Sequence, residues 1–283
     1  MGYTIFDETM ADMTWKDLQR LSAAQAVVLA PWEVLEEHGP HMPIAMDVYL
    51  GYRLTRCVRG FLSQEGILSV IAPPNYWGIN NVTAAFPGSF TLRKETLKAF
   101  MYDTFACLKR WGFEQVFVIS EHGDVNHRKA LLEGIAEARV GCGIRAFGLI
   151  PYRYAKYAGL TGKEEHLLIL PPDANPIPFT AFTEHQDIHA GALETSFMLR
   201  YYPALVDIEQ ARNLSPIIFG AEDWKKWATG WSDAQEVVPQ GYNGDPASVK
   251  PELAEAFIEE EAKSIARLIG SYLRGTYQAP AIE

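Results

Sequence analysis

The sequence predicts an α/β protein in which a mainly parallel sheet has helices on both faces. Four short apolar runs indicate strands that are buried on both sides, at residues 26–30, 68–72, 115–119 and 144–150. Apolar residues at helical spacing indicate helices between these strands, at about 47–61, 92–111 and 125–138. Strands that alternate with helices of this length are joined by crossover connections and therefore run parallel.

Three further helices are expected, at about 15–21, 187–199 and 251–273. Thr14 is a suitable N-cap for the first of them, and Pro251 occupies the first position of the last. Two long segments between these elements, 151–180 and 203–250, are expected to be mostly irregular. Because the chain has no internal repeat and no clear linker, we predict one domain over residues 1–283.

The composition limits the classes of function. Of the 283 residues, 48% are hydrophobic and 21% are charged, as in a globular protein with a sizeable core. The formal net charge of −10 argues against a nucleic-acid partner, because phosphate binding requires clustered lysine and arginine. No apolar run approaches the roughly 20 residues that are needed to cross a membrane.

The cysteines and the N-terminus predict a cytoplasmic location. Cys57, Cys107 and Cys142 are odd in number, widely spaced and set in apolar or helical contexts, which is typical of reduced core cysteines. The first residues include Asp7, Glu8 and Asp12 and lack the pattern of a secretory signal.

A polar motif comes directly after the first predicted strand. Residues 36–41 have the sequence EEHGPH, and Asp47 follows closely. Carboxylates and imidazoles together suit a divalent metal such as zinc or manganese, and Pro40 and Pro43 would stiffen the segment. A polar surface loop with two histidines would have the same composition, so the motif alone leaves both interpretations open.

The distribution of histidine favours the metal site. Six of the seven histidines lie in three short windows that also contain glycine and acidic residues, at 36–47, 120–127 and 185–194. The second window follows the third predicted strand, just as the first window follows the first strand. Ligands of parallel sheets bind beyond the carboxyl ends of the strands, so we expect these two windows at one edge.

The spacing within the windows suggests two metal ions. Glu36 and His38 are alternate residues and would face the same way in an extended segment. Asp47 could then bridge two adjacent ions, and His122 and Asp124 would complete one ligand set each. Hydrolases use ions about 3.5–4 Å apart to polarise a carbonyl and to lower the pKa of a bridging water.

The same motifs resemble a known family. The pattern E-x-H-G-P-H-x-P at 36–43, with Asp47 nine residues after His38, resembles the signature of the creatininase (creatinine amidohydrolase) family. The run D-x-H-A-G-x-x-E-T-S at 187–196 follows in the order of the family. Two shorter runs are similar to family landmarks, FPG at 86–88 and GYNGDP at 241–246. The resemblance extends over nearly the whole chain.

The resemblance implies a three-layer α/β/α sandwich, commonly a homohexamer, with two divalent metal ions per chain. The ions would be zinc and/or manganese, with iron also possible. The implied activity is hydrolysis of a non-peptide C–N bond in a small amide, lactam or formamide by a metal-bridged hydroxide. By position, Glu36, Asp47 and His122 would bind one ion. His38, Asp47 and Asp124 would bind the other.

The resemblance also implies the catalytic residues. His189 would polarise the carbonyl or protonate the leaving nitrogen. Glu194 would orient a ligand or replace a weak one. Asp124 is one methylene shorter than the glutamate usual in the family, so Asp124 and Glu194 are both candidates for completing the second metal site. Residues 151–186 do not match creatininase closely, and creatinine is therefore not predicted as the substrate.

Two alternatives remain. The first is a deformylase that acts on a nucleotide-derived formamide, for which Arg128 and Arg153 would supply positive charge. The second is a catalytically silent relative that serves as an assembly or ligand-binding protein.

Other residues are predicted to be structural. His127 is expected to support a metal ligand or cap a helix, and His41 is expected to bond to the backbone. Trp224, Trp227 and Trp231 have helical spacing and predict one packed helix face.

Overall fold

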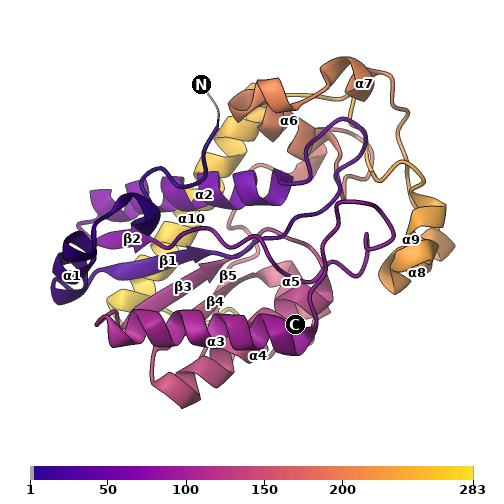
Figure 1. Cartoon of the computed structure of the whole chain (residues 1–283). Coiled ribbons are helices and arrows are strands. Elements are labelled where there is room, and N and C mark those ends of the chain that lie inside the picture. Colours follow the sequence, from indigo (N-terminus) through magenta and orange to yellow (C-terminus); the bar gives the residue numbers. More distant parts are fainter. Residues whose placement is uncertain (1–2, 283) are drawn as a thin grey trace.

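The computed structural model describes residues 3–282 and is built around a parallel sheet (Figure 1). Its strands are β1 (Val27–Pro31), β2 (Ser69–Ile71), β3 (Gln115–Ile119), β4 (Arg145–Pro151) and β5 (Leu167–Leu170). They lie in the order β2-β1-β3-β4-β5, and each neighbouring pair is parallel. The predicted parallel α/β sheet is confirmed.

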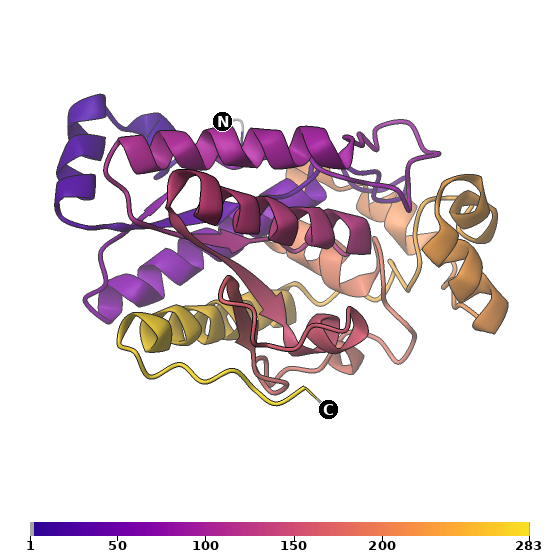
Figure 2. The same ribbon diagram turned by 90° about the horizontal axis from the view of Figure 1, so that it is seen from below.

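Helices cover both faces of the sheet (Figures 1 and 2). One face carries α2 (Met46–Gln64), α6 (Ala192–Tyr201) and α10 (Pro251–Leu273), and the other carries α3 (Lys94–Arg110) and α4 (Val125–Cys142). Alternate strand residues pack into the hydrophobic cores on the two faces of the sheet. Val27 and Leu29 lie in the core beneath α2, α6 and α10, and Val28 and Ala30 lie in the core beneath α3 and α4. The expected three-layer α/β/α arrangement is confirmed.

The predicted caps form at the helix ends. The first helix, α1 (Trp15–Ala23), has a capping box in which Thr14 accepts from the Asp17 amide and Asp17 accepts from the Thr14 amide. The last helix begins at Pro251 as expected, because a proline at this position loses no helical hydrogen bond.

The segment predicted as irregular at 151–180 contains two elements that were missed. Strand β5 adds a fifth strand beside β4, and α5 (Tyr152–Tyr157) precedes it. Four residues of β5 are too few to show a period, and pairing with β4 and burial in the two cores stabilise them. The helix expected within 187–199 begins only at Ala192.

Residues 203–250 contain three short helices instead of a continuous loop. These are α7 (Ile208–Arg212), α8 (Ala221–Thr229) and α9 (Trp231–Val237), and the last two project from the body of the protein (Figures 1 and 2). Gly230 adopts a φ of 79° and separates α8 from α9, so Trp231 lies on a different helix from Trp224. The prediction of one packed tryptophan face is therefore wrong.

Two expectations from composition also have structural outcomes. Cys57, Cys107 and Cys142 are unpaired by disulfides. Among the residues that the structure describes, no helix combines the length and the apolar character that a bilayer span requires.

The topology brings the polar motifs to one edge. Pro31 at the end of β1 pairs with Ile119 at the end of β3, so the segments that follow leave the sheet side by side. The first turn of α2 carries Asp47 to the same edge, and the first turn of α6 carries Glu194 there.

Candidate metal centre

The segment after β1 is extended and buried. Residues 33–38 have no regular secondary structure, and Glu36 and His38 are only 4% and 1% exposed. Because alternate residues of an extended segment point the same way, both side chains reach one polar cluster. Gly39 then begins a turn with a φ of 67°, a conformation that favours glycine.

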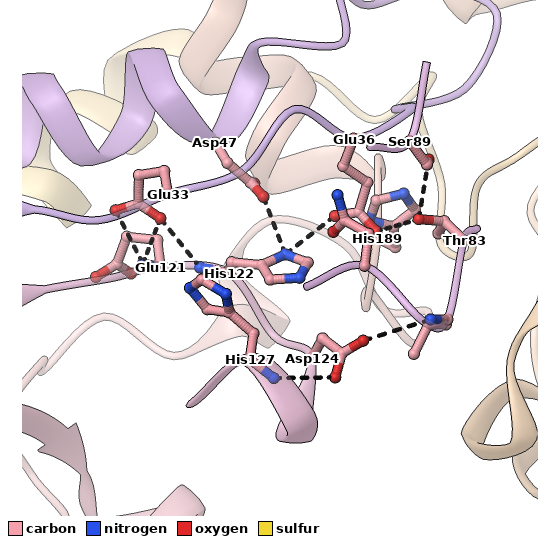
Figure 3. Close-up of polar contacts among 12 residues, drawn as sticks. Glu33, Glu36, Asp47, Thr83, Ser89, Glu121, His122, Asp124, His127 and His189 are labelled. Carbon is pink, nitrogen blue, oxygen red and sulfur yellow. Dashed lines mark hydrogen bonds and ion pairs between the residues drawn. The ribbon is translucent and has the colours of Figure 1, made fainter. Parts of the chain in front are cut away.

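Asp47 lies between His38 and His122 at the centre of this cluster, and Figure 3 shows its contact with His122. Its Oδ2 is 3.1 Å from His122 Nδ1, and its Oδ1 is 3.2 Å from His38 Nε2. Glu36 Oε2 is also 3.1 Å from His122 Nδ1, and Glu194 Oε2 is 3.8 Å from His38 Nε2. Asp47 is therefore shared by two sets of ligand atoms, one with Glu36 and His122 and the other with His38 and Glu194.

Backbone carbonyls orient both imidazoles. His122 Nε2 lies 3.1 Å from the carbonyl oxygen of Ile79, and His38 Nδ1 lies 3.0 Å from that of Glu36. The opposite ring nitrogens, His122 Nδ1 and His38 Nε2, are left facing the carboxylates. His38 Nε2 is buried without a hydrogen-bond partner, as expected of an atom that binds a metal. The donor set thus fits divalent cations of the zinc and manganese type.

The charges of the cluster stabilise one another. Burial alone would lower the pKa of His38, but the carboxylates of Asp47 and Glu194 outweigh it and raise the pKa to about 10. Glu36 and Asp47 likewise raise the pKa of His122 well above its usual value against the effect of burial. Burial would raise the pKa of Glu36, but His122 and His189 lower it to about 2. Burial would likewise raise the pKa of Asp47, but His38 lowers it, whereas the pKa of Glu194 is raised by burial. Glu36 and Asp47 therefore supply the negative charge that favours cations in the site.

Asp124 does not join this cluster, in contrast to the sequence prediction. It is the N-cap of α4, and its Oδ1 accepts from the amides of Asn126 at 2.7 Å and His127 at 3.3 Å. Its Oδ2 accepts from the Asn81 amide at 2.7 Å (Figure 3). Both oxygens are therefore bonded to backbone, and none of the three metal-capable groups in the described residues contains Asp124. Helix capping has determined its orientation.

Glu194 takes the place that was expected for Asp124, and the turn before α6 holds it. Ala190 adopts a φ of 52°, uncommon for a residue with a side chain, and its amide donates to Glu194 Oε2 at 2.6 Å. Asp187 caps the helix by accepting from the amides of Ala192 at 3.0 Å and Leu193 at 2.9 Å. The third sequence motif is thus a helix start that fixes Glu194.

His189, which the sequence predicts to face the substrate, lies beside the cluster. Its ring centroid is 4.4 Å from that of His38, and the three side chains of Glu36, His38 and His189 form a further metal-capable group. The carbonyl oxygen of Glu37 lies 2.9 Å from His189 Nε2. Trp227 of α8 packs its ring 5.8 Å from His189, a contact that the sequence did not indicate.

Two hydroxyl residues outside the predicted set of ligands, Thr83 and Ser89, support Glu36. Thr83 Oγ1 donates to Glu36 Oε1 at 2.5 Å, and Ser89 Oγ donates to Thr83 Oγ1 at 3.1 Å (Figure 3). Ser89 Oγ also accepts from the Glu37 amide at 3.0 Å. Serine and threonine are too common for such a chain to be recognised without the fold.

The remaining histidines of the windows have structural partners. His127 Nδ1 accepts from the Ile79 amide at 3.2 Å and so fixes the residue whose carbonyl orients His122. His41 Nε2 lies 2.8 Å from Thr195 Oγ1, so its partner is a hydroxyl group and not the predicted backbone. Burial, helped by the charges of His38 and His189, lowers the pKa of His41 to about 4.

A cavity of about 340 Å³ adjoins the cluster, and Glu194 belongs to both. Its lining combines apolar side chains such as Phe179 and Phe257 with four carboxylates and one cation, Arg153. Burial and the neighbouring Glu121 raise the pKa of Glu261 well above its usual value. The cavity therefore combines apolar side chains with carboxyl groups, and burial favours the protonated form of Glu261.

Comparison with known proteins gives one family. Residues 11–269 match the family model named Creatininase and described as creatinine amidohydrolase. A creatinine amidohydrolase of Pseudomonas putida is 27% identical over 76% of this chain and 79% of its own length. A mycofactocin precursor peptide peptidase of Mycolicibacterium smegmatis is 25% identical over 86% of this chain and 83% of its own length.

Solved structures agree in fold. A crystal structure of creatinine amidohydrolase (creatininase) superposes with a TM-score of 0.70 and 24% identity, covering 94% of this chain and 97% of the other. A manganese creatininase gives a TM-score of 0.68 at 23% identity, covering 94% of this chain and 98% of its own. A mutant creatininase of Zn–Zn type gives 0.68 at 22% identity, covering 96% of this chain and 99% of its own.

Proposed function

The chain belongs to the creatininase family, and from this premise we propose that it hydrolyses a C–N bond of a small amide, lactam or formamide with two divalent metal ions, zinc and/or manganese. The observation that carries the proposal is the position of Asp47. Its two oxygens face His122 and His38 separately, so one carboxylate can serve two ions.

We assign Glu36, Asp47 and His122 to one ion, and His38, Asp47 and Glu194 to the other. This assignment replaces Asp124 by Glu194, because Glu194 lies within reach of both His38 and Asp47 whereas Asp124 does not, although both carboxylates accept from backbone amides. Bound ions of this kind polarise an amide carbonyl and lower the pKa of water toward neutrality. The protein contributes the fixed ligand geometry, since both imidazoles are oriented by backbone carbonyls.

His189 is proposed as the residue that moves a proton to the leaving nitrogen. Burial alone would lower its pKa, but Glu36 raises it to about 9, so the imidazole is protonated at neutral pH in this state. Glu37 fixes the ring by presenting its carbonyl oxygen 2.9 Å and its Oε1 3.4 Å from Nε2. Trp227 covers one side of the ring and would exclude water there.

The cavity has little positive charge in its lining, which favours a neutral amide over a nucleotide-derived substrate. Arg153 is the one cation among its lining residues and already lies over the ring of Phe179, at 4.9 Å from the centroid. Arg128, the other candidate phosphate ligand, donates its Nε to the His122 carbonyl and stacks on Tyr154. A deformylase for a nucleotide-derived formamide is therefore the weaker alternative.

Metal analysis tests the proposal directly. We expect two ions per chain after reconstitution with Zn²⁺ or Mn²⁺, and hydrolysis of at least one member of a panel of amides, lactams, formamides and short peptides. Asp47→Asn should lose both ions and all activity, whereas the exposed control Asp173→Asn should keep both. Fewer than one ion per chain in the wild type would overturn the two-metal centre.

A silent relative is distinguished by the same panel. Two bound ions without turnover of any panel member would favour the ligand-binding alternative. The homohexamer and the cytoplasmic location remain predictions, and light scattering of the purified protein would test the first of them.

A further inference from the structure

Glu33 is a buried carboxylate that no part of the proposed chemistry uses. It follows β1 by two residues and is completely inaccessible to solvent. An ionised carboxylate in such a place is costly unless hydrogen bonds compensate it. Glu33 is therefore expected to accept hydrogen bonds from buried groups around it.

The carboxylate accepts from the backbone at the end of β3. The Glu121 amide donates to Oε2 at 3.0 Å and to Oε1 at 3.2 Å, and the His122 amide is 3.4 Å from Oε2 (Figure 3). Ser120 Oγ is also 3.4 Å from Oε2. The Glu121 and His122 amides are the second and third beyond the end of β3, and Glu33 satisfies their hydrogen-bonding capacity.

Arg128 also binds the backbone of His122, at its carbonyl group. Its Nε donates to the His122 carbonyl at 2.8 Å. Three groups thus fix His122: Glu33 binds its amide, Arg128 binds its carbonyl, and the Ile79 carbonyl binds its Nε2 atom. The one polar atom left is Nδ1, which faces Asp47 and Glu36.

Helix α2 has a glycine where Glu33 needs space. A Cβ atom at Gly51 would lie 2.0 Å from Glu33 Oε1 and 2.6 Å from its Cδ, closer than atoms can approach. Gly51 is one turn beyond Asp47, so the two residues share a face of α2. Glycine inside a helix and carboxylate in a core are each unfavourable alone, but here each accommodates the other.

We propose that Glu33 is a positioning residue that holds the backbone of His122 so that Nδ1 points into the metal centre, and that Gly51 is required because it leaves room for the Glu33 carboxylate. The proposal concerns this chain's own ligand placement and rests on the proposed metal centre only for its metal-binding consequence.

Variants at both positions test the pair. Glu33→Ala and Gly51→Ala should each weaken one of the two Zn²⁺ dissociation constants by about 10–100-fold, the usual effect of losing a group that orients a ligand. Gly60→Ala is the matched control, because it lies in the same helix with nothing within 4 Å of the added Cβ. It should leave both constants unchanged.

The double variant separates a true pair from two independent defects. Once Glu33 is alanine, the clash at Gly51 disappears, so Glu33→Ala/Gly51→Ala should bind Zn²⁺ no more weakly than Glu33→Ala alone. Additive losses in the double variant would overturn the proposal. Glu33→Gln keeps one acceptor oxygen and should recover part of the Zn²⁺ affinity. This variant tests the same role if Glu33→Ala fails to fold.

A metal-independent measurement keeps the two proposals distinct. In metal-free protein, amide hydrogen exchange of Glu121 and His122 should accelerate at least about tenfold in Gly51→Ala and Glu33→Gln, but not in Gly60→Ala. If the wild type bound no Zn²⁺, the proposed function would fail while this measurement still decided the role of Glu33. Unchanged exchange in both variants would overturn the positioning role.

Discussion

Replacing Asp124 by alanine should destabilise the protein and leave its metal content intact. The structure gives this carboxylate four backbone donors and places it outside the metal cluster. Glu194 should behave in the opposite way, because its Oε2 faces His38 Nε2. The two substitutions therefore ask which acidic residue completes the second set of ligands.

The expected loss for Asp124→Ala follows from its bonds. Removing the N-cap of α4, which receives the amides of Asn126 and His127, costs about 1 kcal/mol, with an upper range of about 2. The amides of Asn81 and Val82, at 2.7 and 3.4 Å, also lose their acceptor, at roughly 1 kcal/mol each. The sum is about 3–4 kcal/mol of the free energy of unfolding.

Urea denaturation of the metal-free variants measures this loss, and plasma emission spectrometry after Zn²⁺ reconstitution measures the metal content. Asp124→Asn is the matched variant, because asparagine is an equally good N-cap and should keep about half or more of the lost stability. Glu194→Gln should retain stability to within about 1 kcal/mol while it loses one ion per chain.

The opposite pattern would refute the assignment. If Asp124→Ala bound one ion fewer while Glu194→Gln bound both, Asp124 would be the ligand and the capping geometry would belong only to the metal-free state. Equal loss in both variants would mean that the loop at residues 81–82 couples Asp124 to the centre.

Three further outcomes are expected. Thr83→Val should weaken Zn²⁺ binding by about tenfold, because Glu36 Oε1 loses its 2.5 Å hydrogen bond. The control Thr104→Val, in α3, should leave the Zn²⁺ affinity unchanged. Competition with a chelator measures both affinities. The pKa of His41 is lowered from 6.5 to about 4, so its contribution to stability is full above pH 6.5 and is lost as the pH falls toward 4. His41→Gln should therefore remove up to about 3 kcal/mol of the acid dependence in urea titrations, and an unchanged acid dependence would contradict this. Trp227→Ala should lower kcat through His189 while Trp224→Ala, whose ring contacts Phe219, leaves kcat nearly unchanged in steady-state assays.

The sequence was sufficient for the parts of the site that follow strands. Buried apolar runs located β1 and β3, and the rule for parallel sheets placed the polar residues after them at one edge. The extended backbone at 33–38 then brought Glu36 and His38 together as their alternation predicted. These inferences depend only on the spacing of apolar and polar residues and on the order of strands and helices, both of which can be read from the sequence.

Asp124 shows how one residue can fit two patterns, as a metal ligand by its spacing and as a helix cap by its position. His122 and Asp124 have the same spacing as Glu36 and His38, but the chain after Asp124 enters α4 at once. An aspartate directly before a helix has a competing role as its cap, and the predicted helix start at residue 125 already contained that signal. Spacing was given more weight than the helix boundary.

Glu33 and Gly51 could not have been paired from the sequence. One is an acidic residue at the end of an apolar run and the other is a glycine inside a helix 18 positions later. Each is unfavourable for the element that contains it, and neither carries a metal-binding pattern. Their relation becomes visible only in the fold, where α2 packs across the strand ends and Gly51 leaves space for the Glu33 carboxylate.

Charge does not distinguish Asp124 from Glu194 as the last ligand, but it does constrain the substrate. Either choice gives three carboxylates against two divalent cations, so the preference for Glu194 depends on geometry alone. Beyond these ligands lie Glu33, Glu121 and Glu261, each with its pKa raised mainly by burial and with Arg128 acting on all three. Glu121 and Glu261 line the adjoining cavity together with one arginine, which already stacks on Phe179. A raised pKa favours the protonated, neutral form of a carboxyl group, so these residues can donate hydrogen bonds to a neutral amide, which agrees with the substrate class that we propose.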